Sequence, residues 1–108
     1  MTDERVFSFK KVIEDSIEAT SKQHPERPRG YQNIIIAIEE LSELTKELTK
    51  ALRGKPNKEQ MVEELADVTF VTEYIKTIFE ISDLDITKAM TMKARRVMDT
   101  LSIYGQYE

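Results

Sequence analysis

The sequence contains no cysteine and no tryptophan, and only one histidine, three glycines and three prolines. Without cysteine the chain forms no disulfide, thiolate nucleophile or zinc ribbon. The single histidine, His24, excludes a metal site built on two histidines of one chain, and we interpret it as an exposed loop residue. So few turn-forming residues exclude a β-sandwich or a β-barrel, because those folds need turns at short, regular spacing.

Long apolar runs and an excess of positive charge are missing as well. The longest apolar run covers residues 34–38, far less than the ~20 residues of a membrane span, and the first residues lack the apolar stretch of a signal peptide. Sixteen Lys and Arg against twenty Asp and Glu give a net charge of −4, which argues against a general nucleic-acid binder. We therefore expect a cytoplasmic protein with no membrane or nucleic-acid partner.

The composition that remains is that of one small helical domain. Charged residues make up 33% of the 108 residues and hydrophobic residues 40%, which is typical of soluble helical proteins. We predict an all-α fold with a single domain over residues 1–108. Start and stop signals predict helices at about residues 3–20, 31–52, 58–79 and 83–101.

Residues that favour helix ends mark these boundaries. Gly54, followed closely by proline, ends the second helix. Gln60 is placed to return the capping bond of Asn57 at the start of the third helix. The predicted N-caps of the first, third and fourth helices are Thr2, Asn57, and Ser82 or Asp83.

Apolar or small residues, with one threonine at position 72, recur at a spacing of three and four on the two long central helices, as in the stripe of a helical bundle. On the second helix they stand at positions 34, 37, 41, 44, 48 and 51, and on the third at 61, 65, 68, 72, 75 and 79. A short connection makes the two helices an antiparallel hairpin. Because one hairpin makes only a thin core, we expect a homodimer or a dimer of dimers, in which two hairpins pair into a four-helix bundle.

Two pairs of acidic residues lie on these helices. Glu40 and Glu43 are three residues apart, as are Glu64 and Asp67, so each pair shares a helix face. At about 100° per residue both pairs flank the apolar stripe on the same side, where they can face each other across the hairpin groove. Four carboxylates there would repel. Mg²⁺ relieves that repulsion and commonly works with substrate phosphates, which indicates metal-assisted attack of water on a phosphate.

A second interpretation of the acids is a solvated helix face. Glutamate is common on surface helices, and Lys46 and Lys50 offer ion-pair partners on the second helix. On this interpretation the chain is a non-catalytic helical interaction module with an acidic surface. Binding of Mg²⁺ or Mn²⁺ by at least three of the four carboxylates would distinguish the enzyme from the module.

The order and spacing of the acids resemble a known family. EELSEL at residues 39–44, followed by ELAD at 64–67, is similar to the E-x-x-E…E-x-x-D signature of the MazG-like all-α nucleoside triphosphate pyrophosphohydrolases. Gln32, eight residues before Glu40, matches a position often filled by Gln in that family. The resemblance covers about residues 30–96.

The resemblance implies an enzyme that depends on Mg²⁺, with Mn²⁺ as a substitute. It would cleave a (deoxy)nucleoside triphosphate into the monophosphate and pyrophosphate, as in nucleotide-pool housekeeping. The relatives include dimeric dUTPases, dCTP pyrophosphatases and phosphoribosyl-ATP pyrophosphohydrolases, so the motif does not select a base. The implied metal ligands are Glu40, Glu43, Glu64 and Asp67.

Related proteins also place basic residues on the last helix, facing the phosphates. Here Lys93 and Arg96 share a face at i, i+3, and the preceding turn could fold that helix back over the hairpin. A basic last turn favoured by the helix dipole explains these two residues equally well. With Gln32 they are the candidate substrate-binding residues, and no residue is assigned as the general base.

Overall fold

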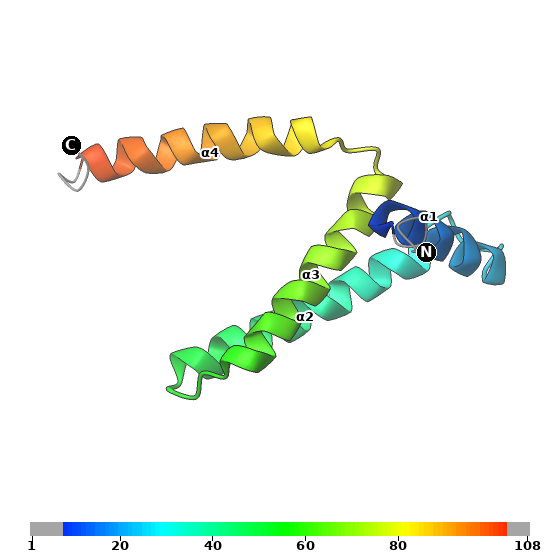
Figure 1. Cartoon of the computed structure of the whole chain (residues 1–108), viewed down its shortest axis with the longest axis horizontal. Coiled ribbons are helices and arrows are strands. Elements are labelled where there is room, and N and C mark those ends of the chain that lie inside the picture. The colour runs from blue at the N-terminus through cyan, green and yellow to red at the C-terminus, as the bar shows by residue number, and fades with distance from the viewer. Residues whose placement is uncertain (1–7, 104–108) are drawn as a thin grey trace, which may run out of the picture.

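The computed structural model describes residues 8–103, and this part of the chain contains four α-helices and no strand (Figure 1). The helices are α1 (Phe9–Gln23), α2 (Tyr31–Leu52), α3 (Lys58–Ile78) and α4 (Asp83–Ile103). The predicted all-α class is confirmed, and the bounds of α2 match the prediction. Within the described residues, none of the helices has both the length and the hydropathy that a membrane span requires.

The first helix begins later than predicted. Ser8 has an extended backbone, and its hydroxyl accepts the N–H of Lys11 at 3.3 Å, so Ser8 is the N-cap and α1 starts at Phe9. The predicted cap, Thr2, lies outside the described residues. The helix continues to Gln23, because the polar segment before the prolines is still compatible with helical geometry.

The caps of α3 and α4 follow the sequence more closely. Asn57 caps α3 by accepting the N–H of Gln60 at 3.0 Å. The predicted return bond, from the N–H of Asn57 to the side-chain oxygen of Gln60, is absent here, and the side chain of Gln60 extends along α3, where its amide nitrogen donates to Glu64. Of the two candidates for α4, Ser82 is the cap and Asp83 is the first helical residue.

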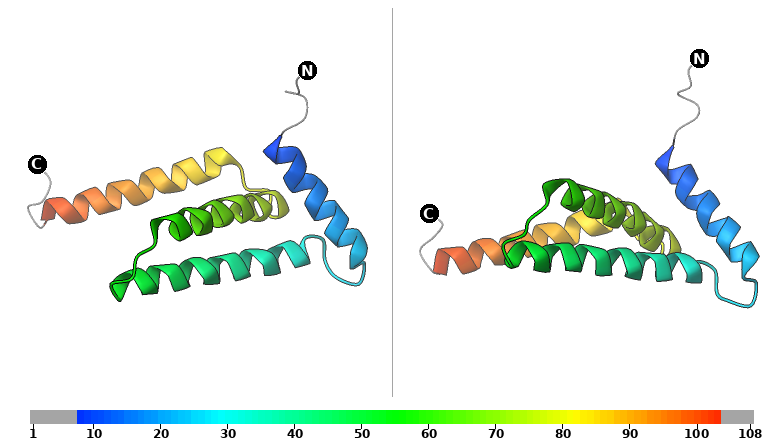
Figure 2. Two further views of the ribbon diagram at one scale, coloured as in Figure 1. Left: turned by 60° about the horizontal axis from the view of Figure 1, so that its bottom comes forward. Right: turned by 90° about the horizontal axis from the view of Figure 1, so that it is seen from below.

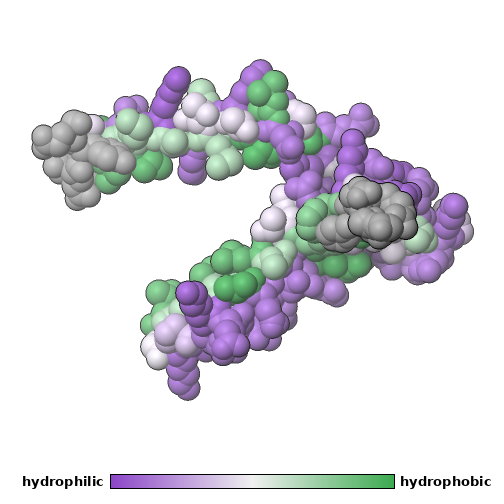
Figure 3. Space-filling view, viewed as in Figure 1, coloured by the Kyte–Doolittle hydropathy of each residue, from purple (hydrophilic) through white to green (hydrophobic). Residues whose placement is uncertain are grey.

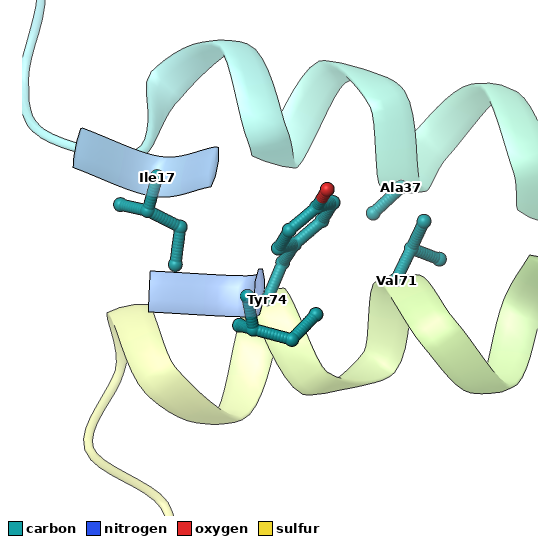
Figure 4. Close-up of a cluster of buried hydrophobic side chains, with 5 residues drawn as sticks. Ile17, Ala37, Val71 and Tyr74 are labelled. Carbon is teal, nitrogen blue, oxygen red and sulfur yellow. The ribbon is translucent and has the colours of Figure 1, made fainter. Parts of the chain in front are cut away.

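The helices α2 and α3 form the predicted antiparallel hairpin, and α1 packs across its open end (Figure 2). Gly54 makes the turn between them with φ +83°, and the N–H of Lys55 bonds the carbonyl of Lys50 at 3.0 Å. The core lies where the three helices meet (Figure 4). Its buried apolar residues are Ile13, Ile17, Ala37, Val71 and Tyr74.

A polar network crosses this core. Asn33 is fully buried, and its side-chain oxygen accepts the hydroxyl proton of Thr20 at 2.6 Å. The hydroxyl of Ser16 lies 3.0 Å from that of Tyr74 and 3.4 Å from the amide nitrogen of Asn33. Buried polar groups without partners are costly, so these bonds define how α1 is placed on the hairpin.

We predict that Gly30→Ala destabilises the protein much more than Gly54→Ala. Both glycines have φ near +80°, a region that costs an L-residue roughly 1–2 kcal/mol. At Gly30 an added Cβ would also lie 2.6 Å from Cδ1 of Ile78, whereas at Gly54 it would meet nothing within 4 Å. Overpacking costs about 1–3 kcal/mol. In urea unfolding, the free energy of unfolding of Gly30→Ala should therefore be lower than that of Gly54→Ala by about that amount. Equal losses would contradict the packing of Ile78 on Gly30.

The last helix, α4, stands apart from the other three. Within the described residues its backbone packs on none of the other helices, its first residue Asp83 reaches α3 only through an ion pair with Lys76, and it contains no buried residue. Figure 1 shows α4 leaving the open end of the hairpin and diverging from it. The expectation that the turn folds α4 back over the hairpin is therefore not met in the single chain.

The apolar stripe predicted on the long helices is covered only in part. Ala37 is buried and Leu44 half-buried, but Leu41 and Leu48 remain exposed on α2, as does Leu65 on α3. One interface between two helices cannot cover both edges of a broad stripe. A single chain therefore leaves apolar surface on its hairpin.

Candidate metal centre

Three of the predicted carboxylates meet across the hairpin. Glu40 extends from α2, and Glu64 and Asp67 extend from adjacent turns of α3. One carboxylate oxygen of each lies within 4.8 Å of the others. The antiparallel arrangement brings Glu40 level with the pair on α3, so residues more than 20 positions apart in sequence form one group. We call these three residues the carboxylate cluster.

Glu64 is the most enclosed member of the carboxylate cluster. It is only 6% exposed, and one of its carboxylate oxygens, Oε2, accepts a hydrogen bond from the amide of Gln60 at 2.7 Å. The other oxygen, Oε1, is buried and has no hydrogen-bond partner. A buried carboxylate oxygen without a partner is costly, and a cation bound between the three residues would provide the missing interaction.

The electrostatic environment of Glu40 also reflects crowding of negative charge. Partial burial raises its pKa above the ordinary value, and the nearby carboxylates of Asp67 and Glu64 raise it further. Glu43 and Glu39 add smaller contributions in the same direction. All of these causes disfavour the charged form of the carboxyl, and a bound divalent cation would reverse that preference.

Glu43, the fourth predicted ligand, lies outside the carboxylate cluster. Its side chain is half-exposed, and its carboxylate lies 3.7 Å from the ammonium of Lys46 on the same helix. The next acid along this face, Glu47, is buried and pairs with Lys50 at 3.1 Å. In this conformation the structure brings together three of the four predicted ligands.

The sequence prediction missed the role of Gln60. We assigned it to helix capping, but it holds Glu64 through an i, i+4 contact on the same helix face. The i, i+4 spacing of Gln60 and Glu64 was the signal in the sequence that could have predicted this contact. Glu47 was also not assigned a role, although its position on α2 falls close to the face of Glu40 at about 100° per residue.

The candidate substrate-binding residues are not gathered around the carboxylate cluster. The amide nitrogen of Gln32 lies 3.2 Å from Nε2 of His24, so it is engaged near the start of α2. His24 is only half-exposed, since it also approaches Glu26. Lys93 and Arg96 lie on α4, which does not pack on any other helix in the described part of its chain.

The donor set of the carboxylate cluster suits a hard divalent cation. Carboxylate oxygens are preferred by Mg²⁺, Ca²⁺ and Mn²⁺, whereas zinc and copper sites generally include imidazole or thiolate ligands. Three protein ligands leave coordination positions for water and phosphate, as is usual for Mg²⁺. The residues present therefore fit the cation that the sequence motif implies.

We predict that Glu40→Gln stabilises the metal-free protein at neutral pH. A carboxyl whose pKa is raised by folding lowers the free energy of unfolding at pH values above that pKa. The loss of stability disappears as the pH falls and the carboxyl is protonated. The neutral amide removes the penalty, so the variant should unfold at higher urea near pH 7 in EDTA, with the difference shrinking toward pH 4. A variant less stable than the wild type at neutral pH would contradict the described crowding.

Comparison of the chain with protein-family models, with characterised proteins and with solved structures finds no match.

Proposed function

We propose that this chain is a Mg²⁺-dependent nucleoside triphosphate pyrophosphohydrolase that converts a (deoxy)nucleoside triphosphate and water into the monophosphate and pyrophosphate. The observation that carries the proposal is the carboxylate cluster, in which Glu64 is buried and has one oxygen without a hydrogen-bond partner. The order of these acids in the sequence, which resembles the MazG-like signature, supports the same conclusion. If these acids formed only a solvated surface, Glu64 would be exposed to solvent, whereas this residue is only 6% exposed.

In this proposal the carboxylate cluster holds the cation between α2 and α3. When bound, Mg²⁺ supplies Lewis-acid stabilisation of the charge that develops on the phosphate oxygens. Gln60 keeps Glu64 oriented by its hydrogen bond, as outer-shell partners of metal ligands commonly do. Asp67, the exposed member, lies at the rim where a phosphate can approach.

Glu43 is the proposed fourth ligand. It needs only to exchange its 3.7 Å contact with Lys46 for the cation. That contact is a surface ion pair, which typically contributes less than about 1 kcal/mol. Side-chain rotation alone can then bring its carboxylate toward the groove, since Glu43 stands one turn from Glu40 on α2.

The proposed enzyme works as a homodimer. Cationic groups are needed near the phosphates, because a triphosphate and several carboxylates together carry more negative charge than Mg²⁺ offsets. Lys93 and Arg96 are the proposed phosphate ligands, and since α4 lies apart from its own hairpin, they would act on the site of a second copy.

The experiment that tests the function is a panel of common and modified nucleoside triphosphates, assayed for released pyrophosphate with Mg²⁺ and with EDTA. We expect Mg²⁺-dependent release of pyrophosphate and monophosphate in equal amounts. Release of inorganic phosphate instead would assign cleavage to a different bond. Absence of any hydrolysis across the panel, together with no binding of Mg²⁺ or Mn²⁺ by calorimetry, would refute the proposal.

A further inference from the structure

An exposed apolar stripe runs along one side of the hairpin. Successive members on α2 are three, four or seven residues apart, and at about 100° per residue they lie on the side of the hairpin away from Glu43 and Asp67. We call this set the hairpin stripe; its members, all between 46% and 89% exposed, are Ile38, Leu41, Leu48, Leu52, Val62 and Leu65. A soluble helix normally buries such a stripe against another element.

A second exposed stripe lies on α4. The helix repeats apolar residues at intervals of three and four, on one face. We call this set the α4 stripe; its members are Ile86, Met90, Ala94, Val97 and Leu101. None of them is buried. Figure 3 shows apolar side chains along the hairpin and along α4, gathered on the sides that border the space between them.

The connection between α3 and α4 holds the two stripes apart. The N–H of Ile81 bonds the carbonyl of Lys76 at 2.8 Å, and Glu80 takes the left-handed conformation with φ 55°. The ammonium of Lys76 also pairs with Glu73 on α3 and with Asp83 at the start of α4. The direction of α4 is thus set by a bonded turn, and folding α4 onto its own hairpin would break that turn.

The surface area of the chain is that of an incomplete assembly. It exposes 8640 Å², whereas a compact monomer of this mass exposes about 6,200 Å². Its radius of gyration is 18.2 Å, against about 13 Å for a compact domain of this length. If each of two chains buried this excess area against the other, their interface would bury roughly 4,900 Å² in total, within the range of obligate homodimers.

We propose that the hairpin stripe of each chain is covered by α4 of a second copy, so that two chains interlock and exchange their last helices. Charge favours this pairing over contact between two α4 helices. Residues 86–98 of α4 carry four Lys or Arg and no acid, while residues 31–78 carry nine acids and six basic residues. Packed on a hairpin, α4 meets a surface of opposite net charge. Packed on a second α4, it meets a surface of the same charge, which repels it. This inference does not depend on the proposed enzymatic activity.

The first test uses the lack of native cysteine. Double variants pair Met90→Cys on α4 with Leu41→Cys or Leu48→Cys on the hairpin, and matched controls replace Met90→Cys with Met92→Cys, on the opposite face of α4. After mild oxidation, non-reducing gels separate a covalent dimer from a monomer closed by an internal disulfide. Helix exchange predicts covalent dimers from the Met90→Cys variants. Mass spectrometry of mixed heterodimers should then locate the disulfide between α4 of one chain and the hairpin of the other. Internal disulfides alone, or α4-to-α4 links alone, would overturn the proposal.

The second test measures assembly by sedimentation equilibrium of the full chain. Met90 and Met92 are similarly exposed in the single chain, at 65% and 57%, but only Met90 belongs to the α4 stripe. We expect Met90→Glu to weaken dimerisation more than about tenfold, because it places a charge in an apolar interface, and Met92→Glu to change it less than about threefold. Equal effects of the two variants, or a wild type that is monomeric at micromolar concentration, would overturn the proposal.

Discussion

Glu64→Gln is expected to abolish Mg²⁺-dependent pyrophosphate release, and Glu63→Gln, one residue away, to leave it unchanged. Glu64 is buried in the carboxylate cluster, while Glu63 is exposed and outside it. Loss of an outer-shell partner already costs about 10- to 100-fold in metal affinity or activity, so loss of a ligand should cost more than 100-fold. Steady-state kinetics of the two variants, with calorimetry of Mn²⁺ binding, measure the effect.

Stability measurements separate loss of the site from loss of the fold. The Glu64→Gln variant should keep its helical circular dichroism in EDTA, because the amide preserves shape and removes a negative charge. For the wild type, a cation at 100 times its dissociation constant should add about 2.7 kcal/mol to the free energy of unfolding, and the variant should lose that gain. Activity within twofold of the wild type, or an undiminished gain from the cation, would refute the metal assignment.

Lys93→Ala is expected to lower kcat/KM by about 10- to 100-fold, corresponding to the roughly 1.5–3 kcal/mol of a hydrogen bond to a charged group. Part of the loss should appear in kcat, because charge moves onto the leaving pyrophosphate in the transition state. Lys88→Ala is the matched control, since Lys88 lies on α4 but points away from Lys93 at about 100° per residue. Relative preference among nucleosides should change little, because every substrate carries the same phosphates.

Mixing the Glu64→Gln and Lys93→Ala variants determines whether Lys93 acts on its own chain or on a second one. A heterodimer of Glu64→Gln and Lys93→Ala has one intact site only if the lysine crosses to the partner. Random pairing should then restore about a quarter of the wild-type activity. No recovery from a mixture shown to contain heterodimers would mean that α4 returns to its own site, or that the phosphate ligands lie elsewhere, at Lys46, Lys50, Arg53 or Lys55.

The helices were predictable because their signals are local. Gly54 and Asn57 mark the turn and the cap by their own backbone preferences, and both do so in the structure. The acids were predictable as a group because the i, i+3 spacing places two on one face of a helix, whatever surrounds them. Ser8 was missed, since an equally suitable cap, Thr2, stands closer to the first acids of the chain.

The sequence alone determined that this protein is helical, that α2 and α3 form a hairpin, and which acids can face each other, because residue type and periodicity control all three. Tertiary structure decided that Glu64 is buried with an unpartnered oxygen while Glu43 turns to Lys46, because burial and side-chain direction depend on the facing helix. It also decided that α4 stands away from the hairpin. An amphipathic pattern requires a covering surface but does not say which chain supplies it, and here the bonded turn after α3 holds α4 away from its own hairpin.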